Sequence, residues 1–430
     1  MILTIVAFVI ILSLLVFVHE LGHFLTAIKF GVRVDEFGFG LPPRIIGYQV
    51  EKIPGTPAVT EEDNTVAIAE TESPSELELT KETILTSRIE VGATPARKKI
   101  RWVWGNKFDG DGQNIIYSLN WIPIGGFVKI KGENGDSREE KDSFGSKSIA
   151  KRVGILSAGV IMNLFLCIVL LSLGFMIGLP SVIGDNSGGQ IVSQPKVQVL
   201  EVIADTPAKQ ADIHVGDVIV SIDGQAIEKI TDLQTYLAGK KDQKVTVQLT
   251  RDASALTKEL TIKEFQGTVG MGVSLMNTGI VRFPWYLAIW HGLKTTFIWL
   301  VTIFVTLFLI IKNLIFGAPI GVELAGPVGI AVLTGQAAKM GFIYVLQFAA
   351  LLSLNLAIIN ILPFPALDGG RIMFLIVEKV RGRAIKQKWE NLSHNIGFLL
   401  LMLLVLVVTY KDVLRYGGRI AGAFKKIIGA

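Results

Sequence analysis

The chain opens with the stretch ILTIVAFVIILSLLVFVHELGHFLTAIK, residues 2–29, an apolar run that carries two histidines and a glutamate near its end. About 20 apolar residues suffice to cross a bilayer as a helix, so the stretch predicts a spanning helix. His19 and His23 share one helix face and can bind one metal ion. Glu20 lies beside them, where a carboxylate can take a proton from an activated water. Ionisable groups at membrane depth indicate a functional site.

The composition of the 430-residue chain indicates a multi-span membrane protein that also carries soluble parts. Half of the residues are apolar, and the net charge is only +5. Lys and Arg gather beside the apolar segments, as in proteins that have a lipid bilayer as partner. We therefore expect no nucleic-acid role. The single Cys167 lies inside an apolar segment, which excludes a disulfide framework and predicts a buried, inert thiol.

Four regions are predicted to contain spanning helices: 1–30, 151–180, 340–370 and 393–411. No Lys or Arg precedes the first apolar run and no small-x-small site follows it, so we expect a retained helix rather than a cleaved signal peptide. Region 283–335 also holds a long apolar stretch, about 285–316, but His291, Lys294 and Lys312 interrupt it. We expect this stretch to be interfacial or re-entrant.

Two soluble regions complete the predicted architecture. Region 31–150 is expected to be a cytoplasmic-side loop with membrane-associated β-hairpins and a flexible inserted segment, 56–98, that is rich in Thr, Glu and Ser. Region 195–275 is expected to be a compact, β-rich α+β module with a hairpin turn at Asp223-Gly224. The predicted fold is a polytopic α-helical membrane protein with about four transmembrane helices and this one extracytoplasmic domain.

A third metal ligand is needed, because catalytic zinc usually takes three protein ligands and one water. Asp368 is the candidate. Pro363 and Pro365 must unwind the third predicted span just before it, and unwound backbone at membrane depth is tolerated where it lines a cavity. For Asp368 to reach the histidines, the first and third spans must run in the same direction. The path from 178 to 341 must then cross the membrane an even number of times.

Two asparagines and three histidines remain to be assigned. Asn360, close to the proline break, is expected in the active site. Asn163, in the second predicted span after Gly159, could pack or hydrogen-bond against the site, and the structural role is favoured. His214, His291 and His394 are isolated from the motif and are expected to be surface or interfacial histidines rather than ligands.

The chain resembles the site-2 protease family of intramembrane zinc metalloproteases, in its PDZ-containing bacterial branch. The matching residues follow the family's order over nearly the whole chain. They are His19–His23, Glu36–Gly40, Pro123–Lys129, Gly159 with Asn163, Gly326–Ile330, and Asn360–Gly370. An HExxH sequence alone is a moderate signal. Together with a downstream NxxPxPxLDGG sequence it is highly specific.

The resemblance implies an endopeptidase in which His19, His23 and Asp368 bind Zn²⁺ and Glu20 is general base and acid. It implies that Asn360 holds the substrate backbone or oxyanion, and that Gly38, Phe39 and Gly40 belong to a membrane-associated hairpin. Such a hairpin can pair with a substrate helix as that helix unwinds into a strand.

The resemblance also implies a location and a class of substrate. The location is the bacterial inner membrane. Lys151 and Arg152, just before the second predicted span, are charges beside the membrane that mark its cytoplasmic side, so the active site is expected toward the cytoplasm and the PDZ-like domain outside. The substrates are single-span membrane proteins already trimmed by another protease, often anti-sigma factors.

The PDZ-like module departs from the family pattern, because one copy is legible where some members carry two and a Gly-Leu-Gly-Phe carboxylate loop is absent. Peptide capture and a size filter therefore remain equal alternatives for it. Two other functions compete with proteolysis for the whole chain. A catalytically silent PDZ scaffold would need neither Glu20 nor three ligands. An ion or proton carrier would favour internal repeats, which the sequence lacks.

Overall fold

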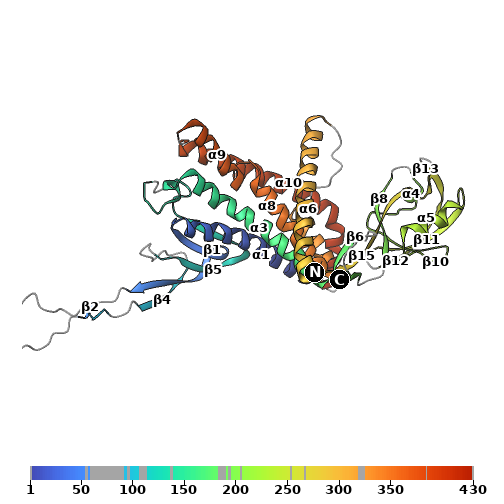
Figure 1. Ribbon diagram of the computed structural model, residues 1–430, viewed down its shortest axis with the longest axis horizontal. Helices are drawn as coiled ribbons and strands as arrows, with labels where there is room; N and C mark the ends of the chain where they lie inside the picture. Colours follow the sequence, from blue (N-terminus) through green and yellow to red (C-terminus); the bar gives the residue numbers. More distant parts are fainter. Residues whose placement is uncertain are drawn as a thin grey trace, which may run out of the picture.

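The computed structural model describes residues 2–53, 57–58, 92–93, 97–105, 114–135, 139–182, 190–191, 195–203, 206–251, 254–265, 268–317, 325–383 and 385–428. Helices form a central bundle, a small β-sheet lies at one end of it, and a second β-rich domain lies at the other end (Figure 1). The predicted insertion 56–98 falls almost entirely outside the described residues. Its described parts are two short paired strands, β2 (Pro57–Ala58) and β3 (Gly92–Ala93), and the first two residues of β4 (Arg97–Trp104).

Five helices of the described chain are long and apolar enough to cross a membrane. They are α1 (Ile2–Lys29), α3 (Ile149–Ile177), α6 (Trp285–Ile315), α8 (Phe342–Ile361) and α10 (Gln387–Ile428). Four of them match the predicted spans, although α10 extends well beyond region 393–411. The largest apolar core of the bundle joins α1, α3 and α8 through residues such as Leu15, Leu171 and Leu354, each at most 2% exposed.

Helices α1 and α8 run in the same direction, as the catalytic geometry requires. Both are antiparallel to α3. His23 contacts Ile155 and His19 contacts Asn163, so α1 runs against α3. Ser353 donates to the Asn163 carbonyl oxygen and Asn360 contacts His19, so α8 ends where α1 ends. The prediction of parallel first and third spans is confirmed.

Helix α6 corrects the expectation for stretch 285–316. It is one continuous helix of 31 residues, so a re-entrant hairpin within the stretch is wrong. It also packs along α3 in the antiparallel direction, with Thr296 near Cys167 and Gly292 near Ser172, which favours a spanning helix over one that lies on the membrane surface. The three interrupting polar residues do not break it, because a helix satisfies its own backbone groups wherever its side chains point. The described bundle therefore has five candidate spans rather than four.

The reversal that the even-crossing argument needs lies after α6 rather than inside it. Helix α7 (Pro327–Met340) leads directly into α8, and its Gly335 lies against Thr4 at the start of α1. Its first turn meets α10 instead, where the Asp412 carboxylate accepts a hydrogen bond from the Gly329 amide at 2.7 Å. Helix α8 therefore begins at the same end of the bundle as α1.

The small sheet is interleaved. Strand β1 (Val34–Ile53) pairs with β4 (Arg97–Trp104) through its second half and with β5 (Ile116–Ile130) through both halves. Phe37 pairs with Tyr117 on one side and with Val128 on the other. The first half of β1 therefore lies between the two halves of β5, and residues 126–130 form an outer edge. The predicted β-hairpins are confirmed as strands, with a more entangled topology.

The second domain is built on one sheet with strand order β12-β11-β9-β8-β15-β6. Its strands are β6 (Leu179–Val182), β8 (Lys196–Val202), β9 (Val218–Ile222), β11 (Lys244–Arg251), β12 (Ser254–Thr261) and β15 (Val273–Arg282). Short helices α4 (Pro207–Gln210) and α5 (Ile230–Ala238) complete it. Strand β10 (Gln225–Ala226) closes the predicted hairpin at Asp223-Gly224.

This domain is joined to the bundle at the end of α3. The Phe283 amide donates to the Phe175 carbonyl oxygen at 2.9 Å, and β6 follows α3 directly. Strands β7 (Gln190–Ile191) and β6 both pair with β15, so the domain begins and ends at one place. The remaining strands β13 (Lys263–Phe265) and β14 (Thr268–Gly270) form a small hairpin beside it.

Candidate active site

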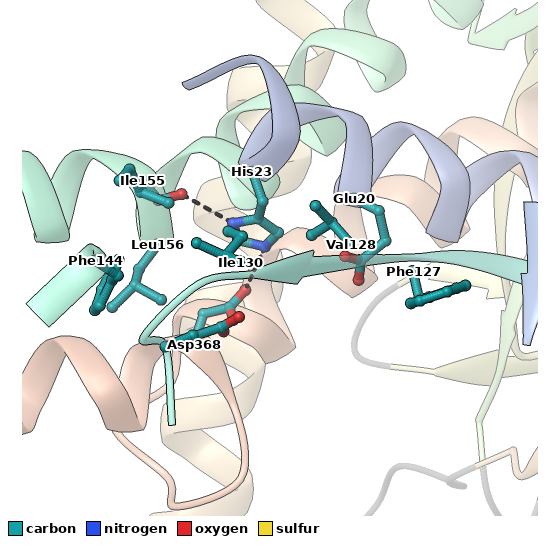
Figure 2. Close-up of a pocket in the computed structure, with 10 residues that line it drawn as sticks. Glu20, His23, Phe127, Val128, Ile130, Phe144, Ile155, Leu156 and Asp368 are labelled. Carbon is teal, nitrogen blue, oxygen red and sulfur yellow. Dashed lines mark hydrogen bonds and ion pairs between the residues drawn. The ribbon is translucent and has the colours of Figure 1, made fainter. Parts of the chain in front are cut away.

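The three predicted metal ligands meet at one point between α1 and α9 (Asp368–Arg381). The Nε2 atoms of His19 and His23 lie 3.2 Å apart. The Asp368 Oδ2 atom lies 3.0 Å from the first and 3.4 Å from the second. Figure 2 shows Asp368 reaching toward His23 from the side opposite to α1. These residues were identified from sequence, and the fold brings them together from positions more than 300 residues apart.

The donor set fits a zinc ion. Zn–N and Zn–O bonds of about 2.0–2.2 Å in a tetrahedron separate neighbouring ligand atoms by about 3.3 Å, close to the three separations seen here. Both histidines are 6% exposed, and the Asp368 side chain is 21% exposed. The Asp368 Oδ2 atom itself is buried without a hydrogen-bond donor. A bound cation would compensate the three converging lone pairs at this largely buried position.

Helix α3 sets the orientation of both imidazole rings. The His23 Nδ1 atom lies 2.8 Å from the Ile155 carbonyl oxygen, which can only accept, so Nδ1 carries the proton and Nε2 keeps its lone pair. The His19 Nδ1 atom lies 3.2 Å from the side-chain amide of Asn163. Asn163 is fully buried, and its Oδ1 is without a partner.

The oxygen and nitrogen of a side-chain amide are assigned from such contacts. The rotated amide lets Oδ1 accept from His19 Nδ1–H, which leaves His19 Nε2 with its lone pair toward the centre.

Gly159 lets α3 approach the two histidines closely. A Cβ atom at this position would lie 2.5 Å from His23 Nε2 and 2.6 Å from His19 Cε1. No side chain fits there without displacing a ring. Gly159 and Asn163 lie one helical turn apart on the same face of α3. The sequence prediction favoured a structural role for Asn163 over a hydrogen bond at the site, and the i, i+4 spacing from Gly159 was the signal that could have decided between them.

The turn before α9 delivers Asp368. Residues 362–367 leave the helical conformation after α8, and Asp368 is the first residue of α9. Two ion pairs hold α9 in place. Arg152 of α3 donates to Glu378 at 2.6 Å with both side chains mostly buried, and Arg371 pairs with Glu133. Arg152 was expected to be a charge beside the membrane, and the structure uses it to fix the helix that carries the ligand.

A pocket opens beside the ligands. It is lined by the catalytic candidates, by the outer edge of β5, by Glu133 and by α3: Glu20, His23, Phe127, Val128, Ile130, Glu133, Phe144, Ile155, Leu156 and Asp368. Glu20 and His23 approach it from α1, and strand residues Phe127–Ile130 pass in front of them (Figure 2). The pocket places a carboxylate, the ligand cluster and a strand edge around one space.

Asn360 also reaches the cluster. Its Nδ2 atom lies 3.4 Å from His19 Nε2, at the end of α8. At this distance the hydrogen bond is weak, and the amide is not committed to the ring. The predicted proximity of Asn360 to the site agrees with the structure.

The predicted substrate-binding residues Gly38, Phe39 and Gly40 lie elsewhere than expected. Gly38 pairs with both Phe127 and Ser118, and Phe39 pairs with both Gly126 and Leu119, so this strand is interior. The Asn120 side chain donates to the Gly40 carbonyl oxygen. An interior strand cannot accept a further strand, because its backbone groups are already used. Residues 126–130 form the edge that faces the pocket, which the sequence pattern alone did not distinguish.

Comparisons with known proteins agree with this site. Residues 7–77 and 105–404 match the model of peptidase family M50. The regulator of sigma-W protease RasP of Bacillus subtilis is 30% identical over 438 residues, which cover 96% of this chain and 98% of the relative. The zinc metalloprotease RasP of Bacillus licheniformis is 30% identical over 441 residues, covering 96% and 99%. A PDZ domain of an SdrC-like protein from Listeria monocytogenes overlaps 20% of this chain at 26% identity, with a TM-score of 0.18.

A helical bundle with this ligand cluster and these relatives defines a membrane-bound metallopeptidase. The chain belongs to peptidase family M50, the site-2 proteases, and is a zinc metalloendopeptidase. Membrane-protein substrates and the lipid bilayer are implied by that class.

Proposed function

We propose that this protein hydrolyses peptide bonds within or near transmembrane segments of single-span membrane proteins, with Zn²⁺ held by His19, His23 and Asp368. The observation that carries the proposal is the convergence of these three ligand atoms, 3.0–3.4 Å apart, beside Glu20 in one pocket. A catalytically silent scaffold requires no such convergence.

Glu20 is the proton carrier in the proposed reaction. A zinc ion bound here supplies Lewis acidity, polarising the scissile carbonyl and acidifying a water. The Glu20 carboxylate lines the same pocket as His23 and Asp368, where it can take the proton of the attacking water. The same carboxyl group then donates that proton to the leaving amide nitrogen.

Asn360 is proposed to bind the scissile carbonyl oxygen as negative charge develops on it. When the His19 Nε2 lone pair is engaged, the Asn360 Nδ2–H groups lose that acceptor and are left beside the cluster as donors. A donor placed at a developing oxyanion stabilises the transition state rather than the substrate.

Strand addition to residues 126–130 is the proposed way in which the substrate is held. This outer edge of β5 lines the pocket through Phe127, Val128 and Ile130. A substrate helix must unwind before water reaches its peptide bonds, and an open strand edge stabilises the unwound form by backbone hydrogen bonds. The proposal moves the binding strand from Gly38–Gly40 to the neighbouring segment.

We further propose that the substrates are trimmed beforehand by another protease and include an anti-sigma factor. The relative named regulator of sigma-W protease supports this substrate class. The proposed location is the bacterial inner membrane, with the active site toward the cytoplasm and the PDZ-like domain outside. That domain and the small sheet lie at opposite ends of the bundle, which supports this arrangement (Figure 1).

The test compares Glu20→Gln with Asp368→Ala, using a co-expressed single-span substrate. Glu20→Gln removes the proton acceptor and leaves every ligand in place, so cleavage should fall by at least about 100-fold while zinc content stays at the wild-type level. Asp368→Ala should lower both. Cleavage is followed by substrate size, and zinc is measured by elemental analysis of the purified protein.

Undiminished cleavage by Glu20→Gln would contradict the proposed role of Glu20. Full zinc occupancy in Asp368→Ala would remove Asp368 from the ligand set. Substrates trapped by Glu20→Gln can be identified by mass spectrometry, and recovery of soluble or multi-span proteins alone would contradict the substrate class.

A further inference from the structure

His394 of α10 holds the turn that carries Asp368. The Ala366 amide donates a hydrogen bond to His394 Nδ1 at 2.8 Å, across 28 residues of sequence. A backbone N–H can only donate, so Nδ1 is unprotonated and the neutral ring carries its proton on Nε2. His394 was expected to be a surface or interfacial histidine, and its ring instead faces the backbone two residues before the ligand.

The turn needs such a partner because its backbone conformation is unfavourable. Ala366 has φ +78°, in the left-handed region that residues with a Cβ atom rarely adopt. Non-glycine residues persist there only when the surrounding structure holds them. The Ala366 hydrogen bond to His394 is one such restraint on the turn.

Helix α10 approaches this turn closely. Gly397, one helical turn after His394, packs directly against the Pro365 carbonyl oxygen, and a Cβ atom there would overlap it. The His394 Nε2 atom is buried without a partner on the other side of the ring. His394 also lines a second, polar pocket together with Glu133, Arg371 and Asn391. The ring thus makes its hydrogen bond toward the turn rather than toward that pocket.

We infer that His394 is a positioning residue for zinc: its Nδ1 atom fixes the Ala366 turn, and the turn sets the position of the Asp368 carboxylate. The inference rests on the proposed function, in which Asp368 is a ligand. It assigns to α10 a part in the metal site although no ligand comes from that helix.

Simple packing is the competing explanation. The His394 ring lies 5.6 Å from the Phe374 ring, centroid to centroid, so it could serve only to fill space beside α9. The two explanations differ in what they require of a substitute. Packing requires volume, whereas positioning requires a hydrogen-bond acceptor at the place of Nδ1.

Three substitutions separate them. His394→Asn places its Oδ1 acceptor close to the Nδ1 position, His394→Gln places its acceptor about one bond further along the side chain, and His394→Leu has volume without an acceptor. The full-length protein is purified in detergent, and zinc affinity is measured by competition with a chromophoric chelator. We expect Asn to stay within about threefold of wild type, and Leu and Gln to lose about tenfold or more, the size of effect seen when a supporting partner of a ligand is removed.

A second measurement needs no zinc. Hydrogen–deuterium exchange of the segment 363–368 is followed in the metal-free protein, where loss of the acceptor should speed exchange at Ala366 in the Leu and Gln variants and not in Asn. Exchange in α3 serves as the control for correct folding. Protection and affinity must change together.

Wild-type zinc affinity and wild-type protection in His394→Leu would overturn the inference in favour of packing. An Asn variant as weak as Leu would also overturn it. Asp368→Ala is measured in the same series. If Asp368→Ala lowers zinc affinity and His394→Leu does not, only this inference fails. If Asp368→Ala itself binds zinc normally, the proposed ligand set fails first.

Discussion

Asn163 shows how a residue that binds no metal can determine whether a histidine does. It lies fully buried in α3 at 3.2 Å from His19 Nδ1, and its own backbone carbonyl is fixed by Ser353 of α8. Burial and the fixed backbone therefore restrict the conformation of the Asn163 side chain. The tautomer of His19 that leaves Nε2 free for a metal is the one in which Nδ1–H donates to Asn163 Oδ1.

At this scale we predict that Asn163→Leu weakens zinc binding by about 10–100-fold, because the His19 ring loses its acceptor. Asn163→Asp should bind zinc at least as well as wild type, since a carboxylate accepts the same hydrogen bond. Chelator competition on the purified protein measures both. Asn163→Asp is the matched control, and equal affinities in the Leu variant and wild type would show that the contact is dispensable.

The sequence predicted the metal ligands, but it did not settle which residues orient them. His19, Glu20, His23 and Asp368 follow from helix periodicity and a proline break, which are local patterns. The Asn163 contact depends on how α3 rotates against α1, and the His394 contact depends on where α10 packs. Such distances between helices are set by packing of side chains from several elements at once, and no local pattern records them.

The outer edge of β5, residues 126–130, is where we predict that the substrate adds as a strand. Successive backbone N–H groups in a strand point to opposite sides, so of Phe127 and Val128 one directs its N–H into the sheet and the other toward the open edge. Proline at the open position should lower substrate cleavage by roughly tenfold or more while zinc content is retained, because an edge strand tolerates proline where its N–H is unpaired. The two single variants are compared by cleavage rate and zinc content.

A different result would redirect the search. If neither proline variant changes cleavage at full zinc content, strand addition at residues 126–130 is wrong. If both variants lose zinc, the edge is structural and the test must move to side-chain substitutions along it.

The PDZ-like domain contains a buried ion pair that makes its stability depend on pH. The Asp217 carboxylate is fully buried and accepts hydrogen bonds from Arg251 Nε at 2.7 Å and Nη2 at 2.8 Å, and from the His214 amide at 2.9 Å. Burial alone raises the pKa of this carboxyl, but the hydrogen bonds outweigh it and leave the pKa below its usual value.

A lowered pKa in the folded state stabilises the domain above the unfolded pKa of about 3.9 and loses that contribution as pH falls through the folded value. We therefore predict that protection of strands β8, β9 and β11 from hydrogen exchange declines below roughly pH 4. Asp217→Asn should destabilise the domain at neutral pH by about 2–3 kcal/mol, since it leaves Arg251 with the longer 3.7 Å contact to the Asp212 carboxylate in place of a short ion pair, and should flatten the acid decline. An unchanged acid profile in Asp217→Asn would assign the decline to other groups.

For the whole molecule, α6 is where the structure departs most from the sequence expectation. Its 31 residues extend about 46 Å, more than the roughly 30 Å of a bilayer core. Phe283 fixes its start at the end of α3. Lysines and a histidine within the stretch suggested a surface location, yet the apolar residues around them still make a helix of spanning length.

Cysteine labelling tests this arrangement in a Cys167→Ala background. Arg282→Cys, before α6, and Met340→Cys, before α8, should react with an impermeant reagent from one side of the membrane, and Phe316→Cys, after α6, from the other. The comparison uses intact cells and inverted vesicles. Labelling of all three from one side would place α6 on the membrane surface, as the sequence alone had suggested.

The hairpin of β1 and β4 has a practical consequence for the molecule as a whole. Ile53 and Arg97 are cross-strand partners, so the chain leaves the sheet and rejoins it about 5 Å away. Because the cost of closing a loop rises only slowly with its length, this junction tolerates very different amounts of intervening polypeptide. It is a natural grafting point: a two-residue Asn-Gly turn, an affinity tag or a fluorescent protein can replace residues 54–96 and report on an enzyme whose catalytic helices are left untouched.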